Sequence, residues 1–319
     1  MKTTIHDPLE FDVLASDLGF TEGPVITEDG AVLVVDIDGG RVVRIADGAV
    51  SVVATPGGGP NGMAPETPTT AVVANNGGFL WSDVSGVRIP IDHLTHTNEP
   101  HGFTGGWIER IDLTTGDVTV LHRECDGRML RGPNDLVIDE AGGVWFTDHG
   151  KGRRESVDRG GLYYIPPSGD TVIEKAFPLL GANGVGLSPD GRRVYVAETF
   201  TGRLWGWDLA APGEIRPASG SLTVRHGGVC VVATPFSFDS LAVEADGRIA
   251  IGAIADGIAV VTPDGSEVDL FPIAGDTTTN IAFGGSDMRR AVITLSRSGR
   301  VVETTWPRPG LPLNIADRV

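Results

Sequence analysis

One pattern recurs six times along this chain and restricts its fold more than any other feature. A short apolar run is followed by a turn with acidic residues and glycine, and then by a second apolar run. Clear copies begin at Gly23, Asn134, Asn183 and Asp239, and weaker copies begin at Asn61 and Asn280. The Asp-Gly and Gly-Gly steps favour tight hairpins, because they tolerate the positive φ that such turns need. Each copy therefore predicts a pair of antiparallel strands.

The copies continue beyond this first hairpin. Each has a glycine-led third strand, as at residues 40–45 and 106–111, and most have a more polar fourth strand, as at 49–54. Six four-stranded antiparallel units are typical of a six-bladed β-propeller. The 45 glycines, 21 prolines and 6% aromatic residues also favour many short strands over long helices. We therefore expect an all-β propeller.

The last copy lacks a clear fourth strand. We expect residues 11–14, near the N-terminus, to supply it and to close the ring, because closure removes two exposed sheet edges. The whole chain, residues 1–319, is then expected to be one propeller domain. A pair of β-sandwiches is the alternative, but no linker or change of composition separates two halves.

The interval between the copies at Asn61 and Asn134 is much longer than the others. The extra residues map to a loop insertion at about 81–105, which contains His93, His96 and His101. Long loops in compact domains are usually functional or mobile. We hypothesise that the insertion is a flap over one end of the channel, and a surface loop without such a role is the alternative.

A polar residue stands at the same point of every copy, just before the innermost strand. The six residues are Glu22, Asn61, Asn134, Asn183, Asp239 and Asn280. The first strand of each blade lines the channel of a propeller, so these side chains are expected to converge on its axis. Two carboxylates meeting there would repel each other without a cation between them. Oxygen ligands suit calcium, magnesium or manganese, and the lack of cysteine and histidine argues against a structural zinc site.

Glu22 and Asp239 are the strongest members of this set. Each lies between apolar neighbours, where an unpaired buried charge is costly. An asparagine before a strand is commonly a turn residue, and that interpretation is the alternative for Asn61 and Asn280.

Five motifs occur in an order that matches a known family. They are Thr21-Glu22-Gly23-Pro24, Pro133-Asn134-Asp135, the run from Asn183 to Gly191, Phe283-Gly284-Gly285, and Pro309-Gly310-Leu311-Pro312-Leu313. Together they resemble the senescence-marker-protein, gluconolactonase and luciferin-regenerating-enzyme family of six-bladed propellers. The resemblance extends along nearly the whole chain.

The resemblance implies a set of functional residues. Glu22, Asn183 and Asp239 correspond to metal ligands, and Asn134 corresponds to a fourth ligand or a substrate contact. Calcium is the usual bacterial metal of the family, and magnesium, manganese or zinc can substitute for it. Members hydrolyse sugar lactones, and relatives cleave organophosphates.

One position departs from the family pattern. Animal members that cleave sugar lactones carry an arginine two residues before the asparagine matching Asn134, and Gly132 stands there in this chain. The neighbouring Arg131 is expected to point to the opposite face. This departure favours a lactone less polar than a sugar lactone.

The predicted chemistry is metal-dependent opening of a lactone. The metal would polarise the carbonyl and activate water, and Asp239 would accept the proton of that water. His149, at the end of a second strand, and His101, in the insertion, are candidate substrate contacts, and a solvated loop histidine is the alternative for both. No G-x-S-x-G motif supports a serine hydrolase.

Two other functions stay open at this stage. The same metal can support hydrolysis of a phosphotriester or fluorophosphate, and a propeller can also be a non-catalytic binding module. The formal charge of −17 disfavours nucleic acid and anionic membranes as partners. The start of the chain lacks an apolar leader, no stretch approaches 18 apolar residues, and the two cysteines suggest no disulfide framework, so a cytoplasmic location is expected.

Overall fold

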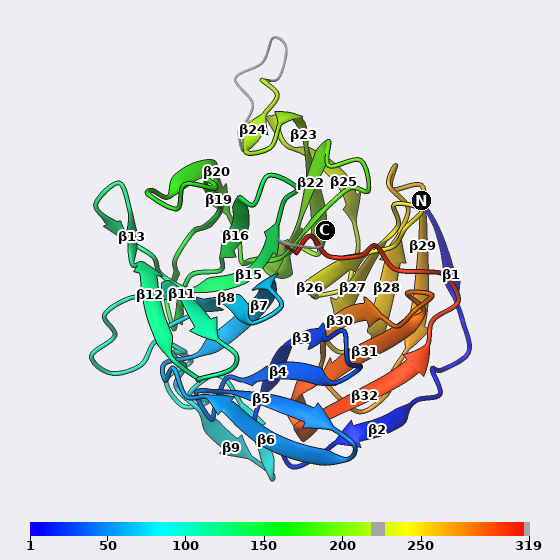
Figure 1. The fold of residues 1–319 in the computed structure, drawn as a ribbon, viewed down its shortest axis with the longest axis horizontal. Helices are drawn as coiled ribbons and strands as arrows, with labels where there is room; N and C mark the ends of the chain where they lie inside the picture. Colours follow the sequence, from blue (N-terminus) through cyan, green and yellow to red (C-terminus); the bar gives the residue numbers. More distant parts are fainter. Residues whose placement is uncertain (218–226, 316–319) are drawn as a thin grey trace.

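The structure is a computed structural model, and it describes residues 1–217 and 227–315. Its main sheets are arranged around a central axis (Figure 1) and confirm the predicted six-bladed all-β propeller. Blade 1 consists, from the axis outward, of β3 (Thr21–Ile26), β4 (Val32–Asp36), β5 (Arg41–Ala46) and β6 (Ala49–Ala54). Blade 2 consists of β7 (Pro60–Thr67), β8 (Thr70–Asn75), β11 (Trp107–Asp112) and β12 (Val118–His122). Blade 3 consists of β15 (Pro133–Ile138), β16 (Val144–Asp148), β19 (Gly160–Ile165) and β20 (Ile173–Leu179).

The second half of the chain repeats this arrangement. Blade 4 consists of β21 (Ala182–Leu187), β22 (Arg193–Glu198), β23 (Arg203–Ala211) and β25 (Val229–Ala233). Blade 5 consists of β26 (Phe238–Val243), β27 (Ile249–Ala253), β28 (Gly257–Val261) and β29 (Glu267–Pro272). Blade 6 consists of β30 (Thr278–Gly284), β31 (Arg290–Leu295), β32 (Arg300–Thr305) and β2 (Asp12–Ala15). Short ribbons lie outside the blades: β9 (Ser82–Val84) with β10 (Val87–Ile89), β13 (Glu124–Cys125) with β14 (Arg128–Met129), and β17 (Gly152–Arg153) with β18 (Ser156–Val157), while β24 (Glu214–Ile215) pairs with β23.

An N-terminal strand closes the ring, as the sequence predicted. β2 pairs antiparallel with β32, with Val13 opposite Val302, and β3 then begins blade 1. The first strands contact one another in chain order, and β30 contacts β3 to complete the circle. No blade interface of the ring is therefore left open.

The pairing of β1 (Lys2–Ile5) was not predicted. It runs parallel to β29 and adds a fifth strand to the outside of blade 5, with Lys2 opposite Glu267. The strand is short and mostly exposed. Its sequence therefore lacks the run of buried apolar residues that identifies the inner strands, such as β4.

Helix is confined, within the described residues, to short 3₁₀ turns such as η1 (Thr199–Thr201) and η3 (Ser296–Ser298). This agrees with the absence of a 3.6-residue apolar period in the sequence. None of the described helical segments has the length and apolar character needed to cross a membrane.

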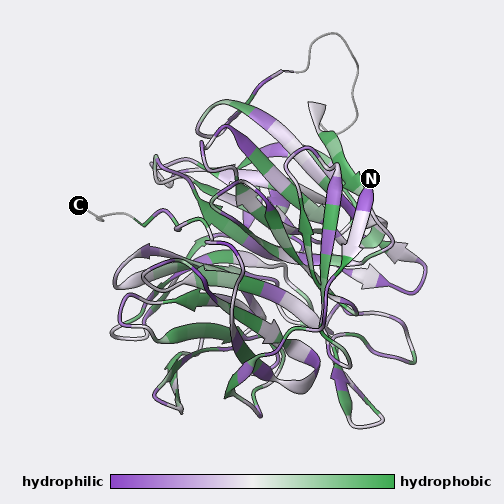
Figure 2. Ribbon diagram, turned by 90° about the vertical axis from the view of Figure 1, so that its right-hand side faces the viewer, coloured by the Kyte–Doolittle hydropathy of each residue, from purple (hydrophilic) through white to green (hydrophobic). Residues whose placement is uncertain are grey.

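The apolar core is divided among the interfaces between blades. Between blades 6 and 1, for example, Val292 and Val301 pack with Val34 and Val43. The hydrophobic residues lie mainly along the strands and the hydrophilic ones along the connecting loops (Figure 2). Because every blade packs against two neighbours, the position of each innermost strand is fixed from both sides.

The C-terminal segment crosses one end of the channel (Figure 1). The Leu311 amide donates to the Val243 carbonyl, and Asn314 Nδ2 donates to the Ile138 carbonyl at 2.9 Å. Arg308 forms an ion pair with Glu244, whose side chain is fully buried. This segment covers an apolar chamber lined by later residues of the innermost strands, so the polar residues at the starts of those strands lie towards the other end.

Ring closure by β2 can be tested by truncation. Removal of residues 1–16 deletes β1 and β2, whereas removal of residues 1–6 deletes β1 alone. We expect the longer truncation to lower Tm by roughly 5–10 °C, because β32 loses its partner, and the shorter one to lower it by about 2 °C or less. Scanning calorimetry measures both, and equal Tm values for the two truncated chains would contradict the role given to β2.

Candidate functional site

A β-bulge interrupts the innermost strand of every blade at the predicted polar position. The ladder shifts between Glu22 and Val25, Pro60 and Met63, Pro133 and Leu136, Ala182 and Val185, Phe238 and Leu241, and Thr278 and Asn280. A bulge inserts unpaired residues and re-aims their side chains. The six-fold repetition of this irregularity explains how residues far apart in the chain reach one point on the axis.

Small residues beside the polar ones allow the innermost strands to approach closely. Gly23 has φ of +51°, and a Cβ atom there would lie 2.5 Å from the carbonyl oxygen of Asn61. A Cβ atom on Gly62 would lie 2.7 Å from the carbonyl oxygen of Asn134. Side chains at these positions would push neighbouring blades apart at the axis.

Five of the six predicted residues line one cavity of about 670 Å³ at the open end of the channel. They are Glu22, Asn61, Asn134, Asn183 and Asp239. The sixth, Asn280, lines the chamber on the opposite side, where its Nδ2 donates to Glu22 Oε2 at 2.7 Å. The structure therefore brings the proposed ligands together and gives Asn280 a supporting role beneath Glu22.

Two buried oxygen atoms in this group have no hydrogen-bond partner among the residues that the structure describes. They are Oε1 of Glu22, a residue 2% exposed, and Oδ1 of Asn134, a residue 7% exposed. Glu22 Oε2, by contrast, accepts from the Gly23 amide and from Asn280. Leaving a carboxylate oxygen desolvated and unpaired is costly, and a divalent cation bound by oxygen ligands would remove that cost. The donor set thus fits a calcium-like cation.

Neighbouring side chains orient Asn183. Its Oδ1 accepts from Ser240 Oγ at 3.3 Å, and its Nδ2 donates to Thr199 Oγ1 at 3.1 Å. Thr199 Oγ1 in turn donates to the Phe238 carbonyl at 2.7 Å. Blades 4 and 5 therefore hold the carboxamide oxygen in a fixed direction.

The carboxyl groups near the axis carry raised pKa values. Burial raises the pKa of Glu22 to about 7. Burial, followed by repulsion from Glu22, raises the pKa of Asp239 well above its ordinary value and that of Asp135 to about 8. Ionising all three groups together therefore requires a compensating positive charge nearby.

Asp135 was not assigned a role from the sequence. It is 6% exposed, and its two carboxylate oxygens accept from the amides of Leu136 at 2.9 Å and Val185 at 3.2 Å. Since both oxygens are used in this way, Asp135 joins blades 3 and 4 behind the proposed metal ligands. Its place between Asn134 and an apolar run was the available signal.

In the part of the chain that the structure describes, no three histidine, cysteine, aspartate or glutamate residues form a group that can hold an ion. The candidate centre instead combines two carboxylates with asparagine amide oxygens, which are also calcium ligands.

The two predicted substrate-contact histidines differ in position. His149 lines the cavity and packs edge-on against Phe200, with ring centroids 5.1 Å apart, and burial lowers its pKa to about 4. Asp148 fixes the adjoining turn by accepting from the amides of Gly132 and Gly150 at 2.8 and 2.9 Å. His101 is exposed and does not line the cavity.

The insertion at 81–105 extends over the cavity mouth. Val84, Val87, Ile89 and Asn98 contribute to the cavity wall. On one side, Arg88 binds Asp38 of blade 1 with N–O distances of 3.0 and 3.1 Å. The insertion therefore forms part of the cavity wall and is not a detached surface loop.

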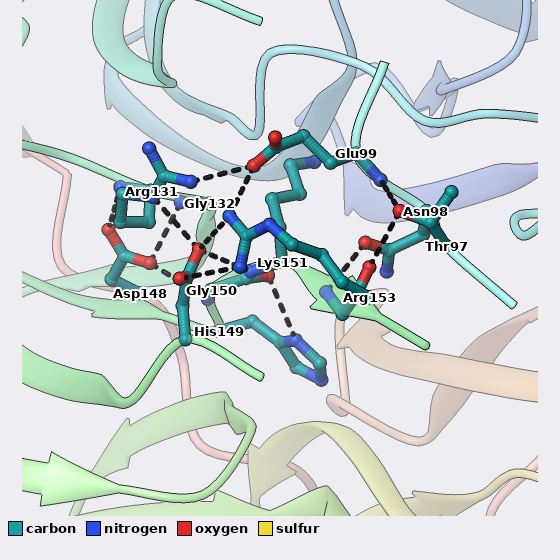
Figure 3. Close-up of polar contacts among 12 residues, drawn as sticks. Thr97, Asn98, Glu99, Arg131, Gly132, Asp148, His149, Gly150, Lys151 and Arg153 are labelled. Carbon is teal, nitrogen blue, oxygen red and sulfur yellow. Dashed lines mark hydrogen bonds and ion pairs between the residues drawn. The ribbon is translucent and has the colours of Figure 1, made fainter. Parts of the chain in front are cut away.

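The other side of the insertion is fastened to blade 3. Glu99 accepts from Arg131 at 2.7 Å and also from Arg153 (Figure 3). Both arginines also bind Asp158. The Gly152 amide donates to Asn98 Oδ1 at 2.8 Å. Arg131 is engaged in this cluster and does not line the cavity, in keeping with the expected direction of its side chain.

Lys151 supports the root of the insertion and was not identified from the sequence. The side chain is fully buried, and its Nζ donates to the Gly78 carbonyl at 2.6 Å and to Asn76 Oδ1 at 3.3 Å. The ammonium also lies 4.1 Å from the ring centroid of Phe79, which lines the cavity. Burial lowers the pKa of Lys151 to about 7. A lysine between glycines carries no sequence signal for such a position.

Known proteins resemble this chain along most of its length. The model of a family described as the SMP-30/Gluconolactonase/LRE-like region matches residues 20–297. A gluconolactonase of Zymomonas mobilis is 25% identical over 298 residues, 88% of this chain and 77% of that protein. Diisopropyl-fluorophosphatase of Loligo vulgaris is 28% identical over 108 residues, 30% of this chain and 34% of that protein. A calcium-binding protein, regucalcin, from Agrobacterium tumefaciens has the same fold, with a TM-score of 0.71 at 18% identity and coverage of 99% of both chains.

The raised carboxyl pKa values predict how the metal-free protein responds to pH. Between the ordinary value of 4.5 for Glu22 and about 7, the folded protein retains a proton that the unfolded chain releases, so stability falls as pH rises. We expect Tm in EDTA to be higher at pH 5.5 than at pH 8. At pH 8, calcium at a hundred times its Kd should stabilise the protein by about 2.7 kcal/mol.

A matched pair of variants makes this test specific. Glu22→Gln should reduce the pH dependence in EDTA and abolish the response to calcium. Glu140→Gln, at an exposed turn position, should retain both. Thermal melts at the two pH values measure these responses, and a full calcium response in Glu22→Gln would refute the ligand assignment.

The attachment of the insertion can be tested at Glu99. Glu99→Ala leaves the guanidinium groups of Arg131 and Arg153 without their shared carboxylate. We expect proteolytic cleavage within residues 81–105 to become about fivefold faster, the effect of losing about 1 kcal/mol of local stability. Glu155→Ala, an exposed position in the turn between β17 and β18, is the control. Unchanged protection in Glu99→Ala would show that this cluster does not hold the insertion.

Proposed function

The chain belongs to the SMP-30/Gluconolactonase/LRE-like family, and on this basis we propose that it is a lactonase that depends on a divalent metal. The observation that carries the proposal is the pair of buried, unpartnered oxygens, Glu22 Oε1 and Asn134 Oδ1, at the floor of the cavity. A cation site beneath an open cavity is the arrangement that metal-assisted hydrolysis needs. The similarity to a gluconolactonase over most of the chain supports a lactone as substrate.

In this proposal Glu22, Asn134, Asn183 and Asp239 hold the metal, and calcium is the expected ion. Their oxygens come from four different blades, and the bulge in each innermost strand directs them inward. When bound, a divalent cation supplies polarisation of the lactone carbonyl and acidification of water. Asn61 lines the same cavity and is available to contact substrate or water.

Asp239 is the proposed general base. It lines the cavity, and its burial makes the carboxylate more basic than an ordinary aspartate. Asp239 accepts a proton as water adds to the carbonyl carbon, the ring C–O bond then breaks, and the departing alcohol oxygen takes up the proton. The product is the open hydroxy acid.

His149 is the proposed substrate-orienting residue. Its lowered pKa keeps the imidazole uncharged at neutral pH, so it can exchange a hydrogen bond with the lactone ring without repelling the cation. Asp148 holds the turn that carries it.

Hydrolysis of a fluorophosphate at the same site is the second candidate. The similarity to diisopropyl-fluorophosphatase over about a third of that protein favours including it. A bound divalent metal can polarise a phosphoryl oxygen in the same way as a carbonyl oxygen. Parallel assays with a lactone and with a fluorophosphate decide between the two activities.

The test is lactone hydrolysis with calcium, with EDTA, and with EDTA followed by calcium. We expect EDTA to abolish turnover and calcium to restore it, and Asp239→Asn to lower kcat by about 10²–10⁴-fold. Asp246→Asn, in the exposed turn that follows β26, should leave kcat unchanged. A wild-type rate in Asp239→Asn would exclude this residue as the base, and turnover in EDTA would exclude metal dependence.

A further inference from the structure

Above its polar floor the cavity wall combines apolar residues with Ser85, Arg88, Asn98, Thr277 and Arg297. The apolar lining residues are Phe20, Ile37, Phe79, Val84, Val87, Ile89, Pro90 and Ile254. Half of these belong to the insertion at 81–105. A bare five- or six-membered lactone ring fills only a small part of about 670 Å³, so most of this apolar surface faces space beyond the reacting ring.

The hairpin formed by β9 and β10 has one apolar and one charged face. Val84 pairs with Val87 and Ser82 pairs with Ile89, so these four side chains project to one side. Asp83 pairs with Arg88 on the other side, where the two form an ion pair at 3.0 Å. Val84, Val87 and Ile89 of the apolar face line the cavity, and Arg88 of the charged face lines it as well.

This apolar face is incompletely buried by the protein itself. Val84 is 38% exposed, and Val87 and Ile89 are partly exposed. Because apolar surface gains free energy when removed from water, an apolar substrate group lying under the hairpin would complete the burial.

The part of the wall that the insertion provides has few free groups for a polyhydroxylated substrate. A desolvated hydroxyl costs free energy unless it finds a hydrogen-bond partner. Of the insertion's lining residues, Ser85 and Asn98 have polar uncharged side chains, and Asn98 Oδ1 already accepts from the Gly152 amide. The guanidinium of Arg88 is paired with Asp38 and Asp83.

The hairpin is also held in place before substrate arrives. Arg88 fixes it to blade 1, β10 packs against η3 of blade 6, and Glu99 fixes the returning segment to blade 3. A wall held at three points keeps its shape, which lowers the entropic cost of binding and sharpens discrimination between substrates.

We propose that the substrate is a lactone carrying an alkyl or aryl substituent, and that the apolar face of the β9–β10 hairpin selects it. This inference rests on the proposed lactonase function. The lactone carbonyl lies at the floor formed by Glu22, Asn134 and Asp239, and the substituent lies under Val84, Val87 and Ile89.

The first experiment compares three lactones in the presence of calcium. They are δ-decanolactone, which carries a pentyl group, unsubstituted δ-valerolactone, and glucono-δ-lactone, each corrected for its own rate with hydroxide. We expect kcat/KM for δ-decanolactone to exceed that for δ-valerolactone by at least about tenfold, as apolar contacts in a pocket provide. A kcat/KM for glucono-δ-lactone equal to or greater than that for δ-decanolactone would overturn the inference.

Matched valine variants test the role of the hairpin. Val84→Ser with Val87→Ser should reduce the preference for δ-decanolactone over δ-valerolactone about tenfold, mainly through KM. Val50→Ser with Val52→Ser, on the exposed outer strand β6, should leave the preference unchanged. Since all four valines are at least partly exposed, both double variants are expected to fold.

A binding measurement separates recognition from turnover. The δ-lactam with the same pentyl group resists hydrolysis, and calorimetry should show about tenfold weaker binding to the hairpin variant than to the wild type. An unaltered preference and unaltered lactam affinity in the hairpin variant would overturn this inference alone. Failure of all three lactones to react with calcium, magnesium or manganese would overturn the proposed function and this inference together.

Discussion

The architecture at the axis is governed by the cost of bringing buried carboxylates together. Glu22, Asp135 and Asp239 lie in one desolvated region, and each has a pKa above its ordinary value because of burial. Asp135 meets this cost with two backbone amides, whereas Glu22 keeps one oxygen without a partner. A cation can offset this cost, because a single ion interacts with several oxygens from different blades at once. The bulge in each of the six innermost strands directs polar side chains towards this region of the axis.

Much of this arrangement was predictable because the fold is a repeat. Each blade places its first strand at the axis, so a polar residue at the same point of each copy predicted which side chains converge there. The closing strand followed from the missing fourth strand of the last copy. Because the fold is a repeat, equivalent positions in the copies predict which distant residues lie close together. For this reason the proximity of Glu22 and Asp239 was predictable although more than two hundred residues separate them.

Other features depended on contacts that no local pattern records. Lys151 is buried by Phe79 and Phe103 from another blade, and its own sequence context is that of a solvated glycine-rich turn. The position of the insertion over the cavity depends on pairs such as Arg88 with Asp38, fifty residues apart. Asn280 was grouped with the other polar residues, yet its side chain supports Glu22 from the opposite side. Such pairings follow from three-dimensional packing, which periodicity alone does not specify.

The segment that crosses the far end of the channel has a kinetic consequence. Arg308, Leu311 and Asn314 fasten it over the chamber beneath the proposed ligands, so in the part of the chain that the structure describes the channel is closed at this end. A reactant molecule and the molecule formed from it must use the same passage, one after the other. If the protein is the proposed lactonase, the hydroxy acid must leave before each new lactone can enter, and a bulky acid that leaves slowly would act as a competitive inhibitor of its own formation.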